Sequence, residues 1–585
     1  MRTGKGAWLV FRKMKQGQST VELIPDIIKA ALDKLPIPKR MRWGDLDAEF
    51  VRPVHWVVLL FGDEVIDTEI LCVRSGRETR GHRFHHGKPL YIGEPAAYAP
   101  LLETEGKVLV DPETRREAIR GQVLEAAKEV DGKAVIDENL LDEVSGLVEW
   151  PVAIVGNFEE RFLDVPAECL ISAMKEHQKY FHVVDGDGRL LPHFITISNI
   201  ESSHPEVVRA GNERVIRPRL TDAEFFWNQD RKTSLGDRVE GLKSILFQQK
   251  LGTLHDKTER IMVLAEQIAA GIGGDPEKAR RAAELAKCDL MTEMVYEFPD
   301  LQGIMGRYYA AHDGEESEVA EALDEQYMPR FAGDRLPATP AGQAVAIADR
   351  LDTLVGIFGI GQPPSGAKDP FGLRRASLGV LRTLIERELD IDVADLIEAA
   401  TRQLSNGGIT VAEDTAARVL EFVMERLRAY YQDRGIAHDT FDAVLARRPT
   451  NPLDFDQRIR AVNAFRELPE AEALAAANKR IHNILKKAGQ SIPDRVESRR
   501  LKEAEEKELA DAVEAAAAEV GPLFTERRYE EALKRLASLR TTVDRFFDEV
   551  MVMADDPKVR ENRLALLKRL GDLFLGAADI SRLQG

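Results

Sequence analysis

The residues best suited to binding a polyanion are concentrated in one stretch, from Met174 to Lys232. A run of arginines there is followed by three adjacent aromatic residues and two more cations: Arg209, Arg214, Arg217, Arg219, Phe225, Phe226, Trp227, Arg231 and Lys232. A guanidinium group binds phosphate oxygens in pairs, and both guanidinium planes and aromatic rings stack on unpaired bases. The stretch is therefore a candidate RNA contact. The same residues also fit a structural helix, with the aromatics packed inside and the arginines solvated.

A hairpin is predicted to lie just before this run. Two apolar segments, Tyr180–Val184 and Leu190–Ile200, flank Asp185-Gly186-Asp187-Gly188. Asp-Gly between apolar segments is a strong signal for a tight turn that joins two strands. The arginines and aromatics then follow the second strand.

A second group of residues suggests a metal site that has been lost. A phosphohydrolase of the HD type needs a His-Asp pair on one helix and a distant His and Asp, because several ligands must converge on a divalent metal. Lys287-Cys288-Asp289-Leu290 looks like that helix with Cys288 in place of the histidine, and Asp349 matches the last aspartate. We expect degenerate HD-like positions at Cys288, Asp289 and Asp349, and no bound metal. Literal His-Asp pairs occur elsewhere, at His255-Asp256, His312-Asp313 and His438-Asp439.

Motifs for nucleotide activation are missing. Gly361 and Gly366 have the spacing of a phosphate-binding loop, but Ala367-Lys368-Asp369 follows, so the lysine is displaced and no hydroxyl is placed to ligate magnesium. The sequence contains no His-Ile-Gly-His, no Lys-Met-Ser-Lys-Ser and no nucleophile elbow. We predict a structured loop over Gly356–Pro370. We also expect no catalytic residue and no cofactor bound by this chain.

The composition limits how the chain meets its partners. The 585 residues carry a net charge of −18, with 44% hydrophobic and 31% charged residues. Any RNA contact must therefore come from local basic patches on an acidic body. No apolar run of about 18 residues is present to span a membrane. The three cysteines, Cys72, Cys169 and Cys288, lack zinc-ligand spacing and fit a reduced, cytoplasmic setting.

The pattern of apolar residues divides the chain into three parts. Residues 1–234 are predicted to be a mixed α+β region, possessing one or two domains; residues 235–389 an HD-like all-helical domain; and residues 390–585 an all-helical domain. Val148–Val155 is expected to be a strand at an edge or a bend, because it contains Pro151. The other expected elements include a strand at Ala7–Phe11 and helices at Leu23–Leu35, Leu246–Gly271, Lys278–Phe298, Asp454–Leu468, Glu470–Lys487, Glu497–Glu519, Thr541–Met553 and Val559–Leu575.

The chain contains several long, idiosyncratic strings of residues: Gln178-Lys179-Tyr180-Phe181, Gly211-Asn212-Glu213-Arg214-Val215, Arg217-Pro218-Arg219-Leu220, Asp222-Ala223-Glu224-Phe225-Phe226, Asp230-Arg231-Lys232 and Lys368-Asp369-Pro370-Phe371-Gly372-Leu373-Arg374-Arg375. These strings resemble the β subunit of the bacterial tetrameric glycyl-tRNA synthetase, and the resemblance covers essentially the whole chain. Phe546-Phe547-Asp548 and Arg560-Glu561-Asn562-Arg563-Leu564 are similar to the helical anticodon-binding domain of arginyl-tRNA synthetases.

The resemblance implies a division of labour between two chains. A separate α subunit is expected to carry the adenylation site and to use ATP and Mg²⁺, while this chain binds tRNA-Gly. Equal numbers of the two subunits, α2β2, are implied, with no DNA and no membrane as partners. In this family the string corresponding to Lys5-Gly6-Ala7-Trp8-Leu9 lies well inside the first domain, so an opening segment is expected to be absent here.

The basic residues on these strings and on the C-terminal helices are the predicted tRNA contacts. They are Lys179, Arg214, Arg217, Arg219, Arg231, Arg374, Arg375, Arg458, Lys479, Arg480 and Arg563. The arginine run is expected to lie near the acceptor side and the C-terminal domain near the anticodon. Two alternatives stay open: a metal-dependent HD phosphohydrolase, and a stand-alone RNA-binding scaffold without catalytic function.

Overall fold

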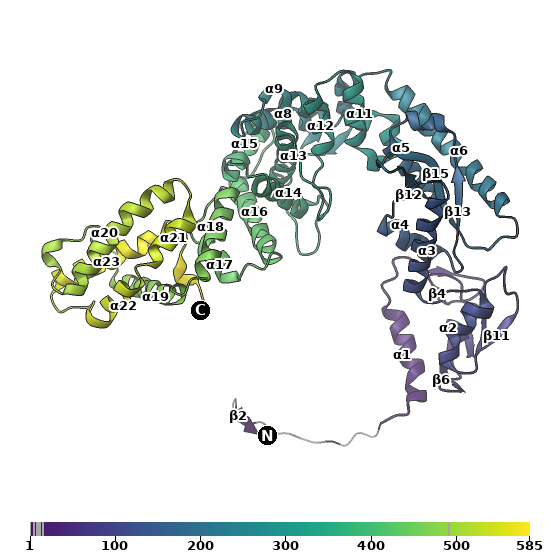
Figure 1. Cartoon of the computed structure of the whole chain (residues 1–585), viewed down its shortest axis with the longest axis horizontal. Coiled ribbons are helices and arrows are strands. Elements are labelled where there is room, and N and C mark those ends of the chain that lie inside the picture. The colour runs from purple at the N-terminus through teal and green to yellow at the C-terminus, as the bar shows by residue number, and fades with distance from the viewer. Residues whose placement is uncertain (1, 4–5, 8–12, 14–16, 490–491, 585) are drawn as a thin grey trace. The chain divides into compact units, whose positions relative to one another are not determined.

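The computed structural model describes residues 2–3, 6–7, 13, 17–489 and 492–584. The chain forms two compact units, Met1–Phe225 and Phe226–Gly585, and Figure 1 traces both from the N-terminus to the C-terminus. The first unit mixes small sheets with helices, and the second is built mainly from helices. The strand expected at Ala7–Phe11 falls largely outside the described residues.

The first unit begins with a pair of two-residue strands, β1 (Arg2–Thr3) and β2 (Gly6–Ala7), which are followed by a helix and a series of very short strands. Helix α1 (Thr20–Lys34) starts earlier than expected, because Ser19 and Glu22 form a capping box; Pro25 therefore lies beyond its first turn. Two-stranded and three-stranded sheets follow, with the strands β3 (Met41–Arg42), β4 (Glu49–Phe50), β5 (Val57–Val58), β6 (Leu60–Phe61), β7 (Glu64–Val65), β8 (Glu69–Ile70), β9 (Val73–Gly76), β10 (Glu78–Arg80) and β11 (Pro89–Tyr91).

A four-stranded antiparallel sheet forms the core of this unit and contains the predicted hairpin. Its order is β12 (Lys133–Ala134), β14 (Phe181–Val184), β15 (Leu190–Ser198) and β13 (Val152–Asn157). Strands β14 and β15 pair antiparallel across the Asp185–Gly188 turn, where Gly188 has a φ of +83°. Strand β13 begins directly after Pro151 and lies at an edge of the sheet, as expected for a strand next to proline.

Two helices cover this sheet. Helix α3 (Pro112–Lys128) supplies Ile119 and Val123 to the core, and α4 (Glu138–Leu147) supplies Leu141 and Val144. These side chains pack with Phe181, Val183 and Ile195 of the hairpin. The short helices α2 (Tyr98–Leu101) and α5 (Ala167–Ser172) complete this part. The hairpin is therefore anchored by this apolar cluster, and the chain that leaves it has a fixed starting point.

The arginine run and the three aromatics form one long helix, α6 (Pro205–Asp230). Ile216, Leu220 and Ala223 are fully buried and lie three or four residues apart, so they define the inner face of the helix. Pro218 lies inside the helix on an exposed position. A proline there removes one backbone hydrogen bond to the carbonyl four residues earlier, that of Arg214.

In the second unit, the helix predicted at Leu246–Gly271 is shorter than expected. Strands β16 (Leu246–Gln248) and β17 (Gly252–Thr253) form a small hairpin, and helix α8 begins only at Leu254 and ends at Gly271. Gly252 has a φ of +88°, and a Cβ there would lie 2.2 Å from the Asp256 carboxylate. Thr253 and Asp256 form a capping box that starts the helix. The apolar residues before Leu254 therefore belong to strands, not to the helix.

The predicted helix at Lys278–Phe298 is also interrupted. Helix α9 (Pro276–Leu285) ends before Cys288, a short turn covers Cys288–Met291, and α10 (Glu293–Glu297) restarts after the cap of Thr292. The break has a physical cause, because the Asp289 carboxylate accepts hydrogen bonds from the backbone N–H groups of Gly303 and Gly306, at 2.5 and 3.2 Å. Residue 289 is thereby turned toward the chain that follows.

Helices make up the remainder of the second unit that the structure describes. They are α7 (Leu235–Arg238), α11 (Ile304–His312), α12 (Ser317–Glu325), α13 (Pro340–Gly359), α14 (Leu373–Glu386), α15 (Val393–Asn406), α16 (Thr415–Gln432), α17 (His438–Leu445), α18 (Pro452–Arg466), α19 (Ala471–Ala488), α20 (Ala504–Thr525), α21 (Tyr529–Ala537), α22 (Arg540–Glu549) and α23 (Pro557–Leu575). Helix α13 is the most buried and packs against α8, α9, α12 and α14. Among the described residues, no helix has the length and apolar content needed to cross a membrane.

Candidate nucleic-acid interface and buried ionic cluster

Helix α6 presents three of the predicted arginines to solvent. Arg214, Arg217 and Arg219 are all exposed. The Arg217 guanidinium lies 2.6 Å from the Glu159 carboxylate, yet its side chain is 53% exposed. The single acid within the run, Glu213, accepts from the backbone N–H of Asn157 at 3.0 Å. The acid is thus held at the end of β13, and the positive charge of the run faces water.

The segment that begins the hairpin contacts this helix through a hydrogen bond. The Tyr180 hydroxyl donates to the Asn212 side chain at 2.6 Å, and the Tyr180 ring stacks on Phe194 with centroids 4.5 Å apart. Burial raises the pKa of Tyr180 to about 12, so the hydroxyl keeps its proton at neutral pH. Lys179 has a left-handed backbone, with φ of +60°, and its ammonium group lies 3.0 Å from Glu143. Lys179 therefore has a partner within its own unit.

The aromatic residues at the end of α6 divide between core and surface. Trp227 is only 8% exposed and stacks on Tyr309 at 5.4 Å between centroids. The Arg231 guanidinium lies over the Trp227 ring at 4.7 Å. Phe225 is 61% exposed. Trp227 and Arg231 thus have packing roles, as the structural interpretation of this stretch predicted, while the arginines before them remain on the surface.

Hydrogen bonds to Asp369 order the end of the Gly356–Pro370 segment, part of which forms the structured loop that the sequence predicts. Its carboxylate accepts from the backbone N–H groups of Leu373 and Arg374, at 2.9 and 3.0 Å. The Arg374 guanidinium donates to the Gly366 carbonyl at 2.6 Å, which closes the loop. Arg374 is half-buried by this contact, whereas Arg375 is exposed. Of the pair, Arg375 is the one that can reach a partner.

Two arginines predicted to contact tRNA are inside the helical C-terminal region. Arg563 is 5% exposed; its guanidinium is paired with the fully buried Glu506 and donates to the Met551 carbonyl at 2.7 Å. Arg458 binds the Asp454 carboxylate at 2.7 Å and the carbonyls of Gly576 and Ala577. Because their donors are used within the fold, both residues have a structural role, and the proposed interface is built from other residues.

Two of the predicted tRNA contacts in this region, Lys479 and Arg480, lie on α19. Lys479 and Arg480 are both exposed. The Arg480 guanidinium lies over the Phe547 ring of α22 at 4.3 Å, so it is oriented by a cation–π contact without losing its charge. The periodicity of the sequence correctly placed both residues on the outer face of a helix. The periodicity could not reveal that Arg458 and Arg563 point inward, because the acids and carbonyls that bind them are not part of the local pattern.

Asp349, one of the three positions predicted to be HD-like, is part of a buried ionic cluster. A carboxylate oxygen of Asp349, on α13, lies 3.2 Å from the Lys257 ammonium group and 3.3 Å from that of Lys287. Asp352, one turn further along α13, binds Lys257 at 3.1 Å and the Arg260 guanidinium at 2.6 Å. Burial alone would raise the pKa of Asp349, but the two ammonium groups hold it well below its usual range. Two lysine side chains therefore occupy the surroundings that a metal ion would need.

Asp289 and Cys288 do not complete a ligand set with Asp349. Asp289 is fully buried, one of its oxygens accepts the two backbone N–H groups described above, and burial raises its pKa to about 6. The Cys288 thiol donates to the Glu284 carbonyl at 3.6 Å, and burial raises its pKa to about 12. A thiol of this kind stays protonated at neutral pH, and only the thiolate binds metals well.

The sequence contains a signal for this cluster in the position of Lys257 on its helix. Lys257 lies in line with Leu254, Ile261 and Leu264 on the apolar face of α8, and it is 3% exposed. A lysine at an apolar position of an amphipathic helix needs a buried acid as its partner. Asp349 and Asp352 are the acids in question, three residues apart on α13.

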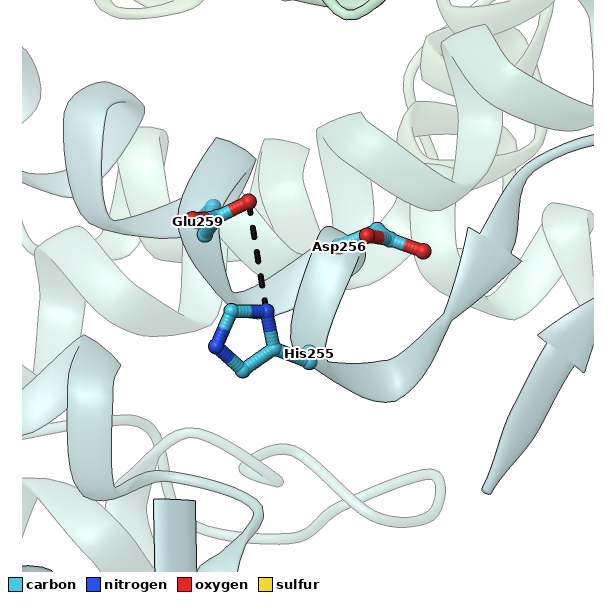
Figure 2. A group of neighbouring side chains, drawn as sticks. All are labelled: His255, Asp256 and Glu259. Atoms are coloured by element: carbon cyan, nitrogen blue, oxygen red, sulfur yellow. Dashed lines mark ion pairs between the residues drawn. The ribbon is translucent and has the colours of Figure 1, made fainter. Parts of the chain in front are cut away.

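One group of side chains has the residue types of a metal site, and Figure 2 shows it at the start of α8. His255, Asp256 and Glu259 offer ligand atoms that all lie within 4.8 Å of one another. Asp256, however, is the capping residue of the helix and accepts from the backbone N–H of Thr253 at 2.7 Å. Figure 2 shows its carboxylate pointing away from the His255 ring, which pairs with Glu259 at 3.9 Å. The cap accounts for the acid, and we do not assign a metal here.

Comparison with known proteins defines first the class and then the family. Residues 474–580 match the DALR anticodon binding domain, so the helical C-terminal part is of the kind that aminoacyl-tRNA synthetases use to bind tRNA. Residues 1–446 match the family model described as glycyl-tRNA synthetase beta subunit. The chain belongs to the glycyl-tRNA synthetase beta subunit family and is a subunit of a glycine–tRNA ligase.

Curated relatives agree with this assignment. The glycine–tRNA ligase beta subunit of Marinobacter nauticus is 58% identical over 585 residues, which is 100% of this chain and 84% of the relative. The corresponding subunit of Hahella chejuensis is 54% identical over 585 residues, with the same coverage. That of Pseudomonas aeruginosa is 54% identical over 578 residues, covering 99% of this chain and 84% of the relative. The family predicted from the sequence strings is confirmed.

Proposed function

We propose that the chain holds tRNA-Gly at two surfaces and leaves the activation of glycine to a separate α subunit. The first surface is the exposed face of α6 with Arg214, Arg217 and Arg219, which binds backbone phosphates near the acceptor side. The second is the C-terminal domain, which binds near the anticodon. The observation that carries the first surface is that these arginines face solvent while the only acid among them, Glu213, is bound at the end of β13.

The net charge of the chain explains why tRNA binding needs a local basic patch. The chain has a net charge of −18, so its overall field repels a polyanion. Local arginines must overcome that field, and phosphate contacts of this kind position the RNA without reading its sequence. Arg375, Lys479 and Arg480 are exposed as well and extend the proposed contacts. Lys179, Arg231 and Arg374 are half-buried with partners of their own and contribute less.

The test is a double substitution on α6, Arg214→Ala with Arg217→Ala. Each phosphate contact that is lost should flatten the slope of log affinity against log salt by about 0.7 to 0.9. We expect weaker tRNA-Gly binding, a flatter slope and unchanged discrimination between anticodons. Arg189→Ala is the matched control, because this arginine is also exposed in the same unit but lies in the hairpin turn beside Asp185 and Asp187. If the double variant binds normally at every salt concentration, the arginines are merely solvated.

For the middle of the chain we favour an HD-like helical domain that holds no metal. The lysine pair at Asp349 and the protonated thiol at Cys288 support this view over the alternative, a metal-dependent phosphohydrolase. Elemental analysis of the purified chain should then find no stoichiometric manganese, iron or zinc. A tightly bound transition metal that is lost in Asp289→Ala would contradict the proposal and favour the phosphohydrolase.

The proposed assembly contains α and β subunits in equal numbers, α2β2, and acts in the cytoplasm. ATP and Mg²⁺ are used at the α subunit, and this chain binds neither of them nor DNA. Copurification with an α chain, followed by mass measurement in solution, tests the stoichiometry. A chain that binds RNA but never captures an α subunit would instead be an RNA-binding scaffold.

A further inference from the structure

A hollow of about 540 Å³ lies in the C-terminal domain, between α20, α23 and the segment 494–501. Its size is within the range of about 300 to 1,000 Å³ that is typical of small-ligand pockets. The floor is apolar and is formed by Leu501, Ala510 and Leu566, which are all buried. The rim is polar, and Lys507 and Asp511 lie on it one turn apart on the same face of α20.

Three charged side chains on this rim lack an ion-pair partner among the residues that the structure describes, whereas charged side chains beside them are paired. Arg495, Lys507 and Asp511 form no ion pair or side-chain hydrogen bond with any residue that the structure describes. Other charged side chains nearby are paired: Lys568 lies 2.5 Å from Asp494, and Arg569 lies 3.2 Å from Glu514. Two cations and one carboxylate around an apolar floor are thus available to a ligand.

Buried contacts hold the walls of the hollow in place. The Asn562 side chain of α23 accepts from the Glu497 backbone N–H at 2.7 Å and donates to the Glu497 carbonyl at 3.2 Å. The buried pair of Glu506 and Arg563 joins α20 to α23. Segment 494–501 and both helices are therefore fixed relative to one another before any ligand arrives, which lowers the entropic cost of binding.

The chemistry of the rim fits one nucleobase in particular. Glycine codons begin with two guanines, so every glycine anticodon has cytosine as its second and third base. The exocyclic N4 amino group of cytosine donates hydrogen bonds, and aspartate or glutamate accepts them. The ring can lie against the apolar floor, while Lys507 and Arg495 can donate to the cytosine carbonyl oxygen or to a phosphate. Uracil presents a carbonyl oxygen where cytosine has the amino group, and that oxygen would face the Asp511 carboxylate without a proton between them.

We propose that this hollow binds an anticodon cytosine of tRNA-Gly, with Asp511 accepting from the N4 amino group. The inference rests on the proposed anticodon role of the C-terminal domain and adds the pocket and the residue that reads the base. Asp511 acts as a specificity residue: it discriminates between bases, whereas the α6 arginines supply affinity.

The experiment uses the complex of this chain with its α subunit and two sets of tRNA-Gly transcripts. One set has the natural anticodon, and the other has uracil in place of the second or the third cytosine. Competition binding gives the preference for cytosine in the wild type, in Asp511→Asn, in Lys507→Ala and in Asp548→Asn. Asp548 is the matched control, because it is an exposed aspartate on α22 of the same domain and does not line the hollow.

We expect Asp511→Asn to reduce the preference for cytosine at one anticodon position by about tenfold, in line with a lost base contact. Lys507→Ala should weaken binding, and Asp548→Asn should match the wild type. Thermal unfolding of each variant, measured in parallel, separates lost recognition from lost folding. The pocket assignment is overturned if Asp511→Asn keeps the full preference, or if it weakens all transcripts equally. In either case, retained tRNA binding by the variant would leave the proposed function of the chain intact.

Discussion

Asp289 is the residue whose protonation should be visible in the stability of the chain. Burial raises its folded-state pKa to about 6, against about 3.9 for an unfolded aspartate. A raised pKa means that the folded state favours the proton, so the stability that Asp289 contributes is present below about pH 4 and is lost as the pH rises through about 6. At neutral pH the ionised carboxylate therefore costs folding free energy.

Replacing this acid by its neutral amide gives the corresponding prediction. Asp289→Asn keeps an oxygen for the N–H groups of Gly303 and Gly306 but has no charge to desolvate. The free energy of unfolding of the variant, relative to the wild type, should increase by about 3 kcal/mol between pH 4 and pH 6 and stay constant above that range. Urea unfolding across this range measures the difference. A difference that does not vary with pH would show that the Asp289 pKa is not raised.

At the scale of the elements, Arg563 joins two helices through a buried ion pair. The side chain of its partner Glu506, on α20, is fully buried, and that of Arg563, on α23, is 7% exposed. Removing one member of a buried ion pair leaves the other charge without compensation, which typically costs about 3 to 5 kcal/mol. The family string Arg560-Glu561-Asn562-Arg563-Leu564 thus describes a structural contact between helices, with Asn562 beside it serving the neighbouring segment.

Comparing a single variant with a double variant tests this role. Arg563→Ala should lower the free energy of unfolding of the C-terminal part by about 3 to 5 kcal/mol, because Glu506 is left unpaired. Glu506→Gln combined with Arg563→Met removes both charges and keeps the volume, so it should lose much less than the single variant. Thermal or urea unfolding followed by circular dichroism supplies the measurement. Equal losses in the single and double variants would mean that the charge pair is not what joins α20 to α23.

The sequence was sufficient to predict elements that have a strong local signal. The hairpin of β14 and β15 follows from Asp-Gly between apolar strands, and α18, α19 and α23 follow from helical spacing of apolar residues. The β16–β17 hairpin was missed, since Leu246 and Phe247 continue the apolar residues of α8, and the left-handed backbone of Gly252 depends on its contact with Asp256. The break after Leu285 was missed because it depends on Asp289 binding the backbone of residues that are distant in sequence.

The candidate site was predictable only in part, for a similar reason. Exposed arginines on α6 follow from their number and spacing, because one helix cannot bury so many cations. The inward orientation of Arg458 and Arg563 depends on acids and carbonyls contributed by other helices, which the local pattern does not contain. The open rim of the C-terminal hollow is likewise a property of packing, since Arg495, Lys507 and Asp511 look like ordinary surface residues in the sequence.

At the scale of the whole molecule, the chain should need a second subunit for chemistry. Activation of glycine requires an ATP site, and the sequence has none of the nucleotide-activation motifs. The purified chain alone should therefore give no glycine-dependent exchange of pyrophosphate into ATP. Mixed with the α subunit, it should support charging of tRNA with glycine, because in the proposed division of labour the α subunit supplies the adenylate and this chain supplies the tRNA contacts. The α6 double variant, Arg214→Ala with Arg217→Ala, is the informative control: the mixture should keep full pyrophosphate exchange while charging falls, since only the tRNA contact is lost. Robust exchange by the purified chain alone would place an adenylation site within it and contradict this division of labour.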